Sequence, residues 1–64
     1  MKARAIRNSG TVYEYSINVH TGAFVMKVND KVVEQDMLSG AEVNERIEDL
    51  FERADMGEVE IVEY

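Results

Sequence analysis

Catalysis in this chain would need a nucleophile beside a base, two carboxylates in a pocket, or a bound metal ion. The only histidine, His20, falls in a predicted turn, and the chain has no cysteine to serve as nucleophile or zinc ligand. Ser39 immediately precedes a predicted helix, where serine caps the first turn. Asp30, Glu34 and Asp36 lack the spacing and the glycine of a calcium-binding loop. These residues indicate no catalytic site, metal or cofactor, and favour a protein that acts by binding.

A row of acidic side chains is the one feature that predicts a particular kind of partner. In the helix predicted over residues 40 to 55, Glu42 and Asp49 precede Arg46 and Arg53 by four residues, the spacing at which helix side chains pair. The acids left without a predicted partner are Glu45, Glu48, Glu52 and Asp55. They share the face opposite the apolar stripe, over about 15 Å, with successive charges about 4.5–6 Å apart. Such a row can imitate a phosphate backbone towards a basic groove.

An acidic helix face has a structural explanation as well as a functional one. Every amphipathic helix needs a solvated face, and glutamate is a good helix former. Glu52 and Asp55, however, lie in the last turn, where the helix macrodipole disfavours anions, and aspartate is a poor helix former. We therefore expect the helix, together with the acidic strand that follows it, to bind a basic surface. The predicted contact residues are Glu45, Glu48, Glu52, Asp55, Glu58 and Glu60.

Charge is distributed unevenly along the chain, whose net charge is −6. Residues 1 to 33 contain five Lys or Arg and two Asp or Glu, a balance of +3, whereas residues 34 to 64 contain two and eleven, a balance of −9. Nucleic acid and anionic membranes repel such a chain, so the expected partner is a basic protein surface, for example that of a nucleic-acid-binding protein or complex. In size and charge, though in no motif, the chain resembles small acidic inhibitors of phages and mobile elements, such as anti-CRISPR and anti-restriction proteins.

Length and composition predict one small domain. A chain of 64 residues can form one hydrophobic core and not two, so we expect a single domain over residues 1–64. The longest apolar run, Ala23 to Met26, is far shorter than a membrane span, and no signal-peptide apolar region follows Met1. Because the absence of cysteine gives no indication of an oxidising compartment, we expect a cytoplasmic location.

Alternating apolar residues and turn residues predict an antiparallel meander followed by one more strand. The predicted strands cover residues 2 to 7, 11 to 19, 23 to 28, 31 to 37 and 59 to 64. The predicted hairpin turns are Asn8-Ser9-Gly10, His20-Thr21-Gly22 and Asn29-Asp30. Val32 and Val33 stand side by side in the fourth strand, which leaves its register undecided.

Capping residues predict a single helix between the fourth and fifth strands. Ser39 and Glu42 form the pattern of a capping box, and Gly57 is placed to end the helix in a left-handed conformation. The residues of the apolar stripe are Val43, Ile47, Leu50, Phe51 and Ala54. The expected fold is α+β, with the helix packed on one face of an antiparallel sheet.

Opposite charges predict where the last strand pairs. Beside the first strand it would run antiparallel, and it would set three bases opposite three acids: Lys2, Arg4 and Arg7 opposite Glu58, Glu60 and Glu63. Each such cross-strand pair contributes roughly 0.2–1 kcal/mol. We therefore expect the sheet order 4-3-2-1-5.

The two faces of the predicted sheet differ in what should cover them. Tyr13 and Tyr15 could stack on nucleic-acid bases, but they share a face with Ile17 and Val19, so we expect them to pack in the core beneath the helix. On the other face, the predicted dimer patch consists of Val12, Val25 and Val62, with Tyr64 as a candidate fourth member. The alternative function is thus a homodimeric domain that associates through its sheet face, with the acids serving solubility.

Overall fold

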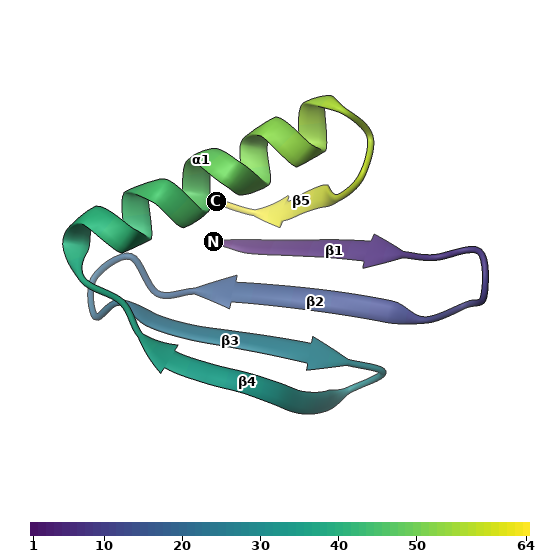
Figure 1. Cartoon of the computed structure of the whole chain (residues 1–64), viewed down its shortest axis with the longest axis horizontal. Coiled ribbons are helices and arrows are strands. Elements are labelled where there is room, and N and C mark those ends of the chain that lie inside the picture. The colour runs from purple at the N-terminus through teal and green to yellow at the C-terminus, as the bar shows by residue number, and fades with distance from the viewer.

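Five strands and one helix make up the chain, in the predicted order (Figure 1). The computed structural model describes residues 1–64, with β1 at Lys2–Ile6, β2 at Val12–Ile17, β3 at Ala23–Val28, β4 at Lys31–Met37, α1 at Gly40–Asp55 and β5 at Glu60–Glu63. The sheet order is β4-β3-β2-β1-β5, and every neighbouring pair is antiparallel. The α+β class, the single helix and the sheet order are confirmed.

Hairpin turns join the first four strands, and residues that tolerate positive φ occupy them. Asn29 and Asp30 have φ of 50° and 68°, as expected of a two-residue turn between β3 and β4. The Asn29 side chain accepts a hydrogen bond from the Val12 N–H at 3.0 Å, and the Asn29 N–H donates to the Val12 carbonyl at 2.9 Å. Gly10, with φ of 86°, lies in the loop between β1 and β2.

Gly22 lies where the β2–β3 loop meets the entry to the helix. Its φ of 81° favours glycine, and its N–H donates to the Asn18 carbonyl at 2.8 Å. Its carbonyl accepts from the N–H of Leu38, also at 2.8 Å. A Cβ at this position would collide with the carbonyl oxygen of Leu38, so no other residue fits without a backbone shift.

Strand β2 is shorter than predicted, and this corrects the placement of Val19. The strand ends at Ile17, and Val19 lies in the following loop with 52% of its surface exposed rather than on the core face. The Asn18 side chain turns the chain here, because its Oδ1 accepts from the N–H groups of His20 and Thr21 at 2.9 and 3.1 Å.

Both ends of α1 are capped as the sequence predicts. The Glu42 N–H donates to Oγ of Ser39 at 3.3 Å, and the Ser39 N–H donates to Oε1 of Glu42 at 3.1 Å, which completes the capping box. At the other end, Gly57 has φ of 77°, and the N–H groups of Gly57 and Glu58 donate to carbonyls of the last turn. This is the Schellman arrangement, in which glycine ends a helix.

The helix packs diagonally across one face of the sheet and covers part of it (Figure 1). The buried apolar residues are Ala3, Ala5, Ile17, Phe24, Leu38, Val43, Leu50 and Val59. Every residue of β4 is exposed, and the molecule is 15 Å thick along its shortest axis, which corresponds to one sheet and one helix layer. The core therefore lies beneath α1, towards β1 and β5, and the β3–β4 side extends beyond it.

A bulge in β4 explains why its register could not be decided. Met26 is paired with Glu34, but the next residue, Lys27, is paired with Val32, so Val33 is an extra residue in β4.

Two of the three predicted charge pairs form between β1 and β5. Nζ of Lys2 lies 3.9 Å from Oε2 of Glu63, and Arg4 lies 3.3 Å from Glu60. The third pair does not form. Arg7 follows the end of β1, and its guanidinium lies 5.7 Å from the centroid of the Tyr13 ring instead of beside Glu58.

Gly22→Ala should lower the free energy of unfolding by more than about 2 kcal/mol, because the new side chain combines an unfavourable φ with a backbone collision. Gly10→Ala is the matched control, since it has a positive φ but nothing within 4 Å of the added carbon, and it should cost about 1 kcal/mol. Urea denaturation measures both. Equal losses would show that the approach to Leu38 does not constrain position 22.

Hydrogen bonds from Ser39, first from its backbone N–H and then from its hydroxyl, hold the pKa of Glu42 below its ordinary value of 4.5. Because the pKa is depressed in the folded state, the ionised carboxylate stabilises the helix above about pH 4.5, and this contribution is lost as pH falls through the lowered folded-state pKa. Glu42→Gln should therefore make thermal stability less sensitive to pH in that acidic range. Thermal melts followed by far-UV dichroism test this, with Glu45→Gln, which has no capping contact, as the control.

Candidate protein-binding surfaces

The outer side of α1 carries a row of exposed carboxylates. Val43 and Leu50 are buried beneath the helix, and the opposite side faces solvent. The acidic face, as we define it, consists of Glu45, Glu48, Glu52 and Asp55, all of which are exposed. The ion pairs of the protein are Lys2–Glu63, Arg4–Glu60 and Asp49–Arg53. No cation therefore neutralises the acidic face.

The two helix arginines leave the acidic face free, but only one of them pairs as predicted. Nε of Arg53 lies 3.1 Å from Oδ2 of Asp49, which confirms that pair. Arg46 does not form the predicted ion pair with Glu42. Its guanidinium lies 4.8 Å from the centroid of the Phe24 ring, a cation–π contact, while the carboxylate of Glu42 accepts from the backbone at the helix cap.

Glu58 and Glu60 are not part of the same row as the helix acids. Glu60 pairs with Arg4, which lies on the sheet face away from α1, and Glu58 is exposed between the helix and β5. The alternation of β5 explains this, because Val59 is buried and Ile61 packs against the core, so that Glu60 points to the other side. The structure thus brings together the four helix residues of the predicted site and separates the other two from them.

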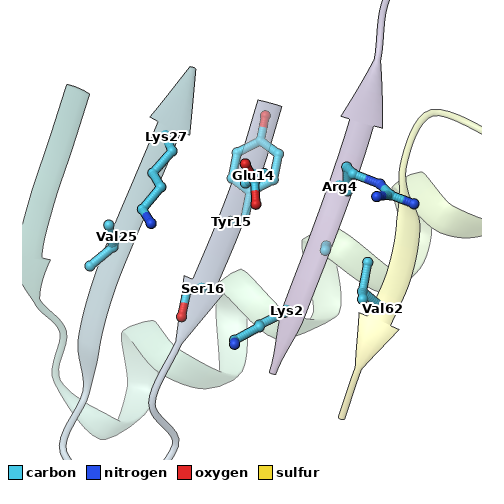
Figure 2. Close-up of a pocket in the computed structure, with 9 residues that line it drawn as sticks. Lys2, Arg4, Glu14, Tyr15, Ser16, Val25, Lys27 and Val62 are labelled. Carbon is cyan, nitrogen blue, oxygen red and sulfur yellow. The ribbon is translucent and has the colours of Figure 1, made fainter. Parts of the chain in front are cut away.

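The sheet face away from α1, called the open face, has a shallow depression of about 310 Å³ (Figure 2). The side chains on this face around the depression are Lys2, Arg4, Glu14, Ser16, Val25, Lys27 and Val62. In the strand register Glu14 faces Arg4 on one side and Lys27 on the other. Charges therefore alternate in sign across three neighbouring strands, and the centre of the open face is charged.

This charged centre divides the valines of the predicted dimer patch. Val25 on β3 and Val62 on β5 lie at opposite sides of the depression (Figure 2). Val12 shares this face by the alternation of β2. Tyr64 does not join them, because its ring stacks on Phe51 of the helix with centroids 5.7 Å apart. A dimer through the open face stays a prediction, and it would have to desolvate the central charges.

A second hollow lies on the helix side of the sheet and was not anticipated from the sequence. We call it the helix-side groove: it has a volume of about 260 Å³ and is lined by Tyr15, Phe24, Met26, Glu34, Arg46, Asp49, Leu50 and Arg53. Tyr13 and Tyr15 were expected to pack in the core beneath the helix; both are half-buried, and Tyr15 packs against the core. The sequence predicts an apolar stripe on the helix, but it does not determine how much of the sheet the helix covers.

No three side chains of the types that ligate metals lie together, and no helix is long and apolar enough to cross a membrane. His20 is an exposed residue of the β2–β3 loop.

A scan against protein-family models, a search of curated proteins and a search of solved structures all find no match. The surfaces of the molecule are therefore the features from which a function can be inferred.

Glu14→Lys should destabilise the sheet by about 0.5–1 kcal/mol, because it would place three cations side by side on β1, β2 and β3. Glu14→Gln, which removes the negative charge without adding a positive one, should cost less. Urea denaturation of the two variants measures the difference. A lysine variant as stable as the glutamine variant would contradict the charge ladder.

Proposed function

We propose that this chain is a non-enzymatic protein-binding module whose acidic face binds a basic surface of a partner. The observation that carries the proposal is the row of four exposed carboxylates on α1 without an ion-pair partner. Exposed charges that are not neutralised within the molecule produce a field that attracts an oppositely charged surface and speeds its encounter.

The helix holds these carboxylates in a fixed arrangement. Its first turn is closed by the capping box and its last turn by the Schellman hydrogen bonds, and Val43 and Leu50 anchor it to the sheet. A partner therefore meets charges about 4.5–6 Å apart along a rigid rod, without having to order them on binding. This preorganisation supports the use of the acidic face as a contact surface.

Regular spacing along a rod suggests the kind of basic surface that fits. A groove that binds the phosphates of nucleic acid presents lysines and arginines along a line, and a row of carboxylates is complementary to that line. We propose a nucleic-acid-binding protein or complex as the partner and mimicry of nucleic acid as the mode of binding. The biological role that suits nucleic-acid mimicry is that of an inhibitor of the phage or mobile-element type, comparable to anti-CRISPR and anti-restriction proteins.

Neutralising the acidic face should abolish most of the binding. The triple variant Glu45→Gln, Glu48→Gln, Glu52→Gln removes three negative charges and keeps good helix formers, so its stability should hardly change. The partner captured by the unmodified protein from its own cells, and identified by mass spectrometry, should bind this variant at least about tenfold more weakly. Binding of the unmodified protein should also weaken with salt, since the Debye length falls from about 10 Å at 0.1 M to about 3 Å at 1 M.

A matched control separates the acidic face from net charge. The triple variant Glu14→Gln, Glu34→Gln, Asp36→Asn also removes three negative charges, all of them from the sheet, and should bind the captured partner almost as tightly as the unmodified protein. Equal losses in both variants would mean that overall charge drives the association. Unchanged affinity in the helix variant would show that the acidic face is only a solvated surface.

A further inference from the structure

The charges of the open face form one row across four strands. In the sheet register Glu14 is paired with Lys27 of β3 on one side and with Arg4 of β1 on the other (Figure 2). Arg4 is paired in turn with Glu60 of β5. The signs along the row, from Lys27 to Glu60, are therefore positive, negative, positive and negative. A half-turn about a line parallel to the strands, midway between β1 and β2, exchanges every charge of this row with one of opposite sign.

The next row along the strands is matched by the same half-turn. Ser16 is paired with Lys2 on one side and with Val25 on the other, and Val62 follows on β5, at the register shift beside Lys2 (Figure 2). The half-turn exchanges Val25 with Val62 and Ser16 with Lys2. Apolar side chains thus meet apolar ones, and a hydroxyl group meets an ammonium group.

A third row lies near the β1–β2 loop, where Ile6 is paired with Val12. Ile6 is 63% exposed, and it lies on the open face because Ala3 and Ala5, which alternate with it, are buried on the helix side. The half-turn exchanges Ile6 with Val12. All three rows of the open face are therefore complementary to a second copy of themselves.

The open face is also neutral, although the chain has a net charge of −6. Three bases and three acids lie on it or at its β5 edge: Lys2, Arg4, Lys27, Glu14, Glu60 and Glu63. The excess of acids therefore lies on other surfaces, including the acidic face. Two copies can approach through the open face with less repulsion than through any strongly acidic surface.

The charge row disfavours the other ways of placing two open faces together. A two-fold axis across the strands, at the level of the row, would set Arg4 against Arg4 and Glu14 against Glu14 of the second copy. An axis along β2 would again set Glu14 against itself. An axis between β2 and β3 would leave Glu60 without a facing strand. Like charges that face each other at an interface are strongly unfavourable, so the line between β1 and β2 is the axis that the charges select.

We propose that the open face binds a second copy of the chain, in a two-fold dimer whose axis runs along the strands between β1 and β2. The two sheets pack face to face, about 10 Å apart and roughly aligned. Arg4 of each copy faces Glu14 of the other, and Lys27 faces Glu60 of the other. This inference goes beyond the proposed function, because it concerns the opposite side of the molecule and leaves both acidic faces exposed. Either proposal can fail without the other.

The contact area indicates a weak dimer. Each charge keeps its neighbours within its own copy and gains an opposite charge across the interface, which offsets part of its desolvation. The apolar pairs supply the attraction. Four strands of about five residues cover roughly 19 by 17 Å per copy, which corresponds to the small interfaces of transient complexes. We therefore expect a dissociation constant between about 1 µM and 1 mM.

Sedimentation equilibrium should show the monomer giving way to a dimer between about 10 µM and 1 mM. Isotope-filtered NMR on a mixture of labelled and unlabelled chains should then detect contacts between Val25 of one copy and Val62 of the other. Within one chain β1 and β2 separate the strands of these two valines, which places them about 14 Å apart. The contact therefore reports on the dimer alone.

Charge reversal at the centre should abolish self-association, and mixing two reversed variants should restore it. Glu14→Lys sets a lysine against Arg4 of the second copy, and Arg4→Glu sets a glutamate against Glu14. In the mixture the new lysine faces the new glutamate, and every other charge of the row faces its opposite. Each variant alone should associate at least about tenfold more weakly than the unmodified protein, and the mixture should form a heterodimer at least as tightly.

A matched control and a second pair of variants keep this test decisive. Glu34→Lys changes the net charge as Glu14→Lys does, but on the helix side of β4, so it should self-associate like the unmodified protein. It should bind Arg4→Glu several fold more weakly than Glu14→Lys does. Lys27→Glu and Glu60→Lys repeat the exchange at the ends of the row, should a central variant fail to fold.

Three results would overturn the inference. A protein that is monomeric at about 1 mM would exclude a second copy and leave the open face to a different partner. Heterodimers of Glu14→Lys with Arg4→Glu that are no tighter than those of Glu34→Lys with Arg4→Glu would exclude the charge row as the selective contact. A dimer without the contact between Val25 and Val62, or with NMR shifts confined to β4, would place the interface elsewhere.

Discussion

The close approach of Gly22 to Leu38 sets the arrangement of the rest of the molecule. The hydrogen bond from the Leu38 N–H to the Gly22 carbonyl joins the loop after β2 to the segment that leaves β4. Leu38 is buried, and Ser39 begins the helix cap one residue later, so this contact fixes where α1 starts and at which end of the sheet it crosses. From that point a helix of 16 residues reaches the far edge, where β5 can pair with β1.

Features that depend on neighbouring residues could be predicted from the sequence, and features that depend on distant contacts could not. The capping box of Ser39, the turn at Asn29 and the left-handed Gly57 are local, and each formed as expected. The sheet order also followed, because opposite charges on the first and last strands favour one pairing. The positions of Arg46 and Tyr64 depend on rings far away in the sequence, Phe24 and Phe51, and no local pattern indicates them.

The same distinction applies to the candidate surfaces. Helical periodicity was enough to predict that Glu45, Glu48, Glu52 and Asp55 share an exposed face. The helix-side groove was missed because its existence depends on the angle at which α1 crosses the sheet. The charges differ between the surfaces: unpaired carboxylates lie on the outer side of α1, charges of alternating sign lie on the open face, and two arginines and two acids line the helix-side groove. Surfaces of such different chemistry suit partners of different chemistry.

The bulge at Val33 has a consequence for the behaviour of the protein in concentrated solution. Strand β4 is an edge strand of seven exposed residues that include Val32, Val33 and Met37, and its outer backbone groups could template the addition of a strand from another molecule. A bulge distorts such an edge, and charged residues along it, here Glu34 among them, oppose a continuous ladder. The β4 bulge, which left the register undecided from the sequence, thus disfavours edge-to-edge polymerisation and amyloid-like aggregation.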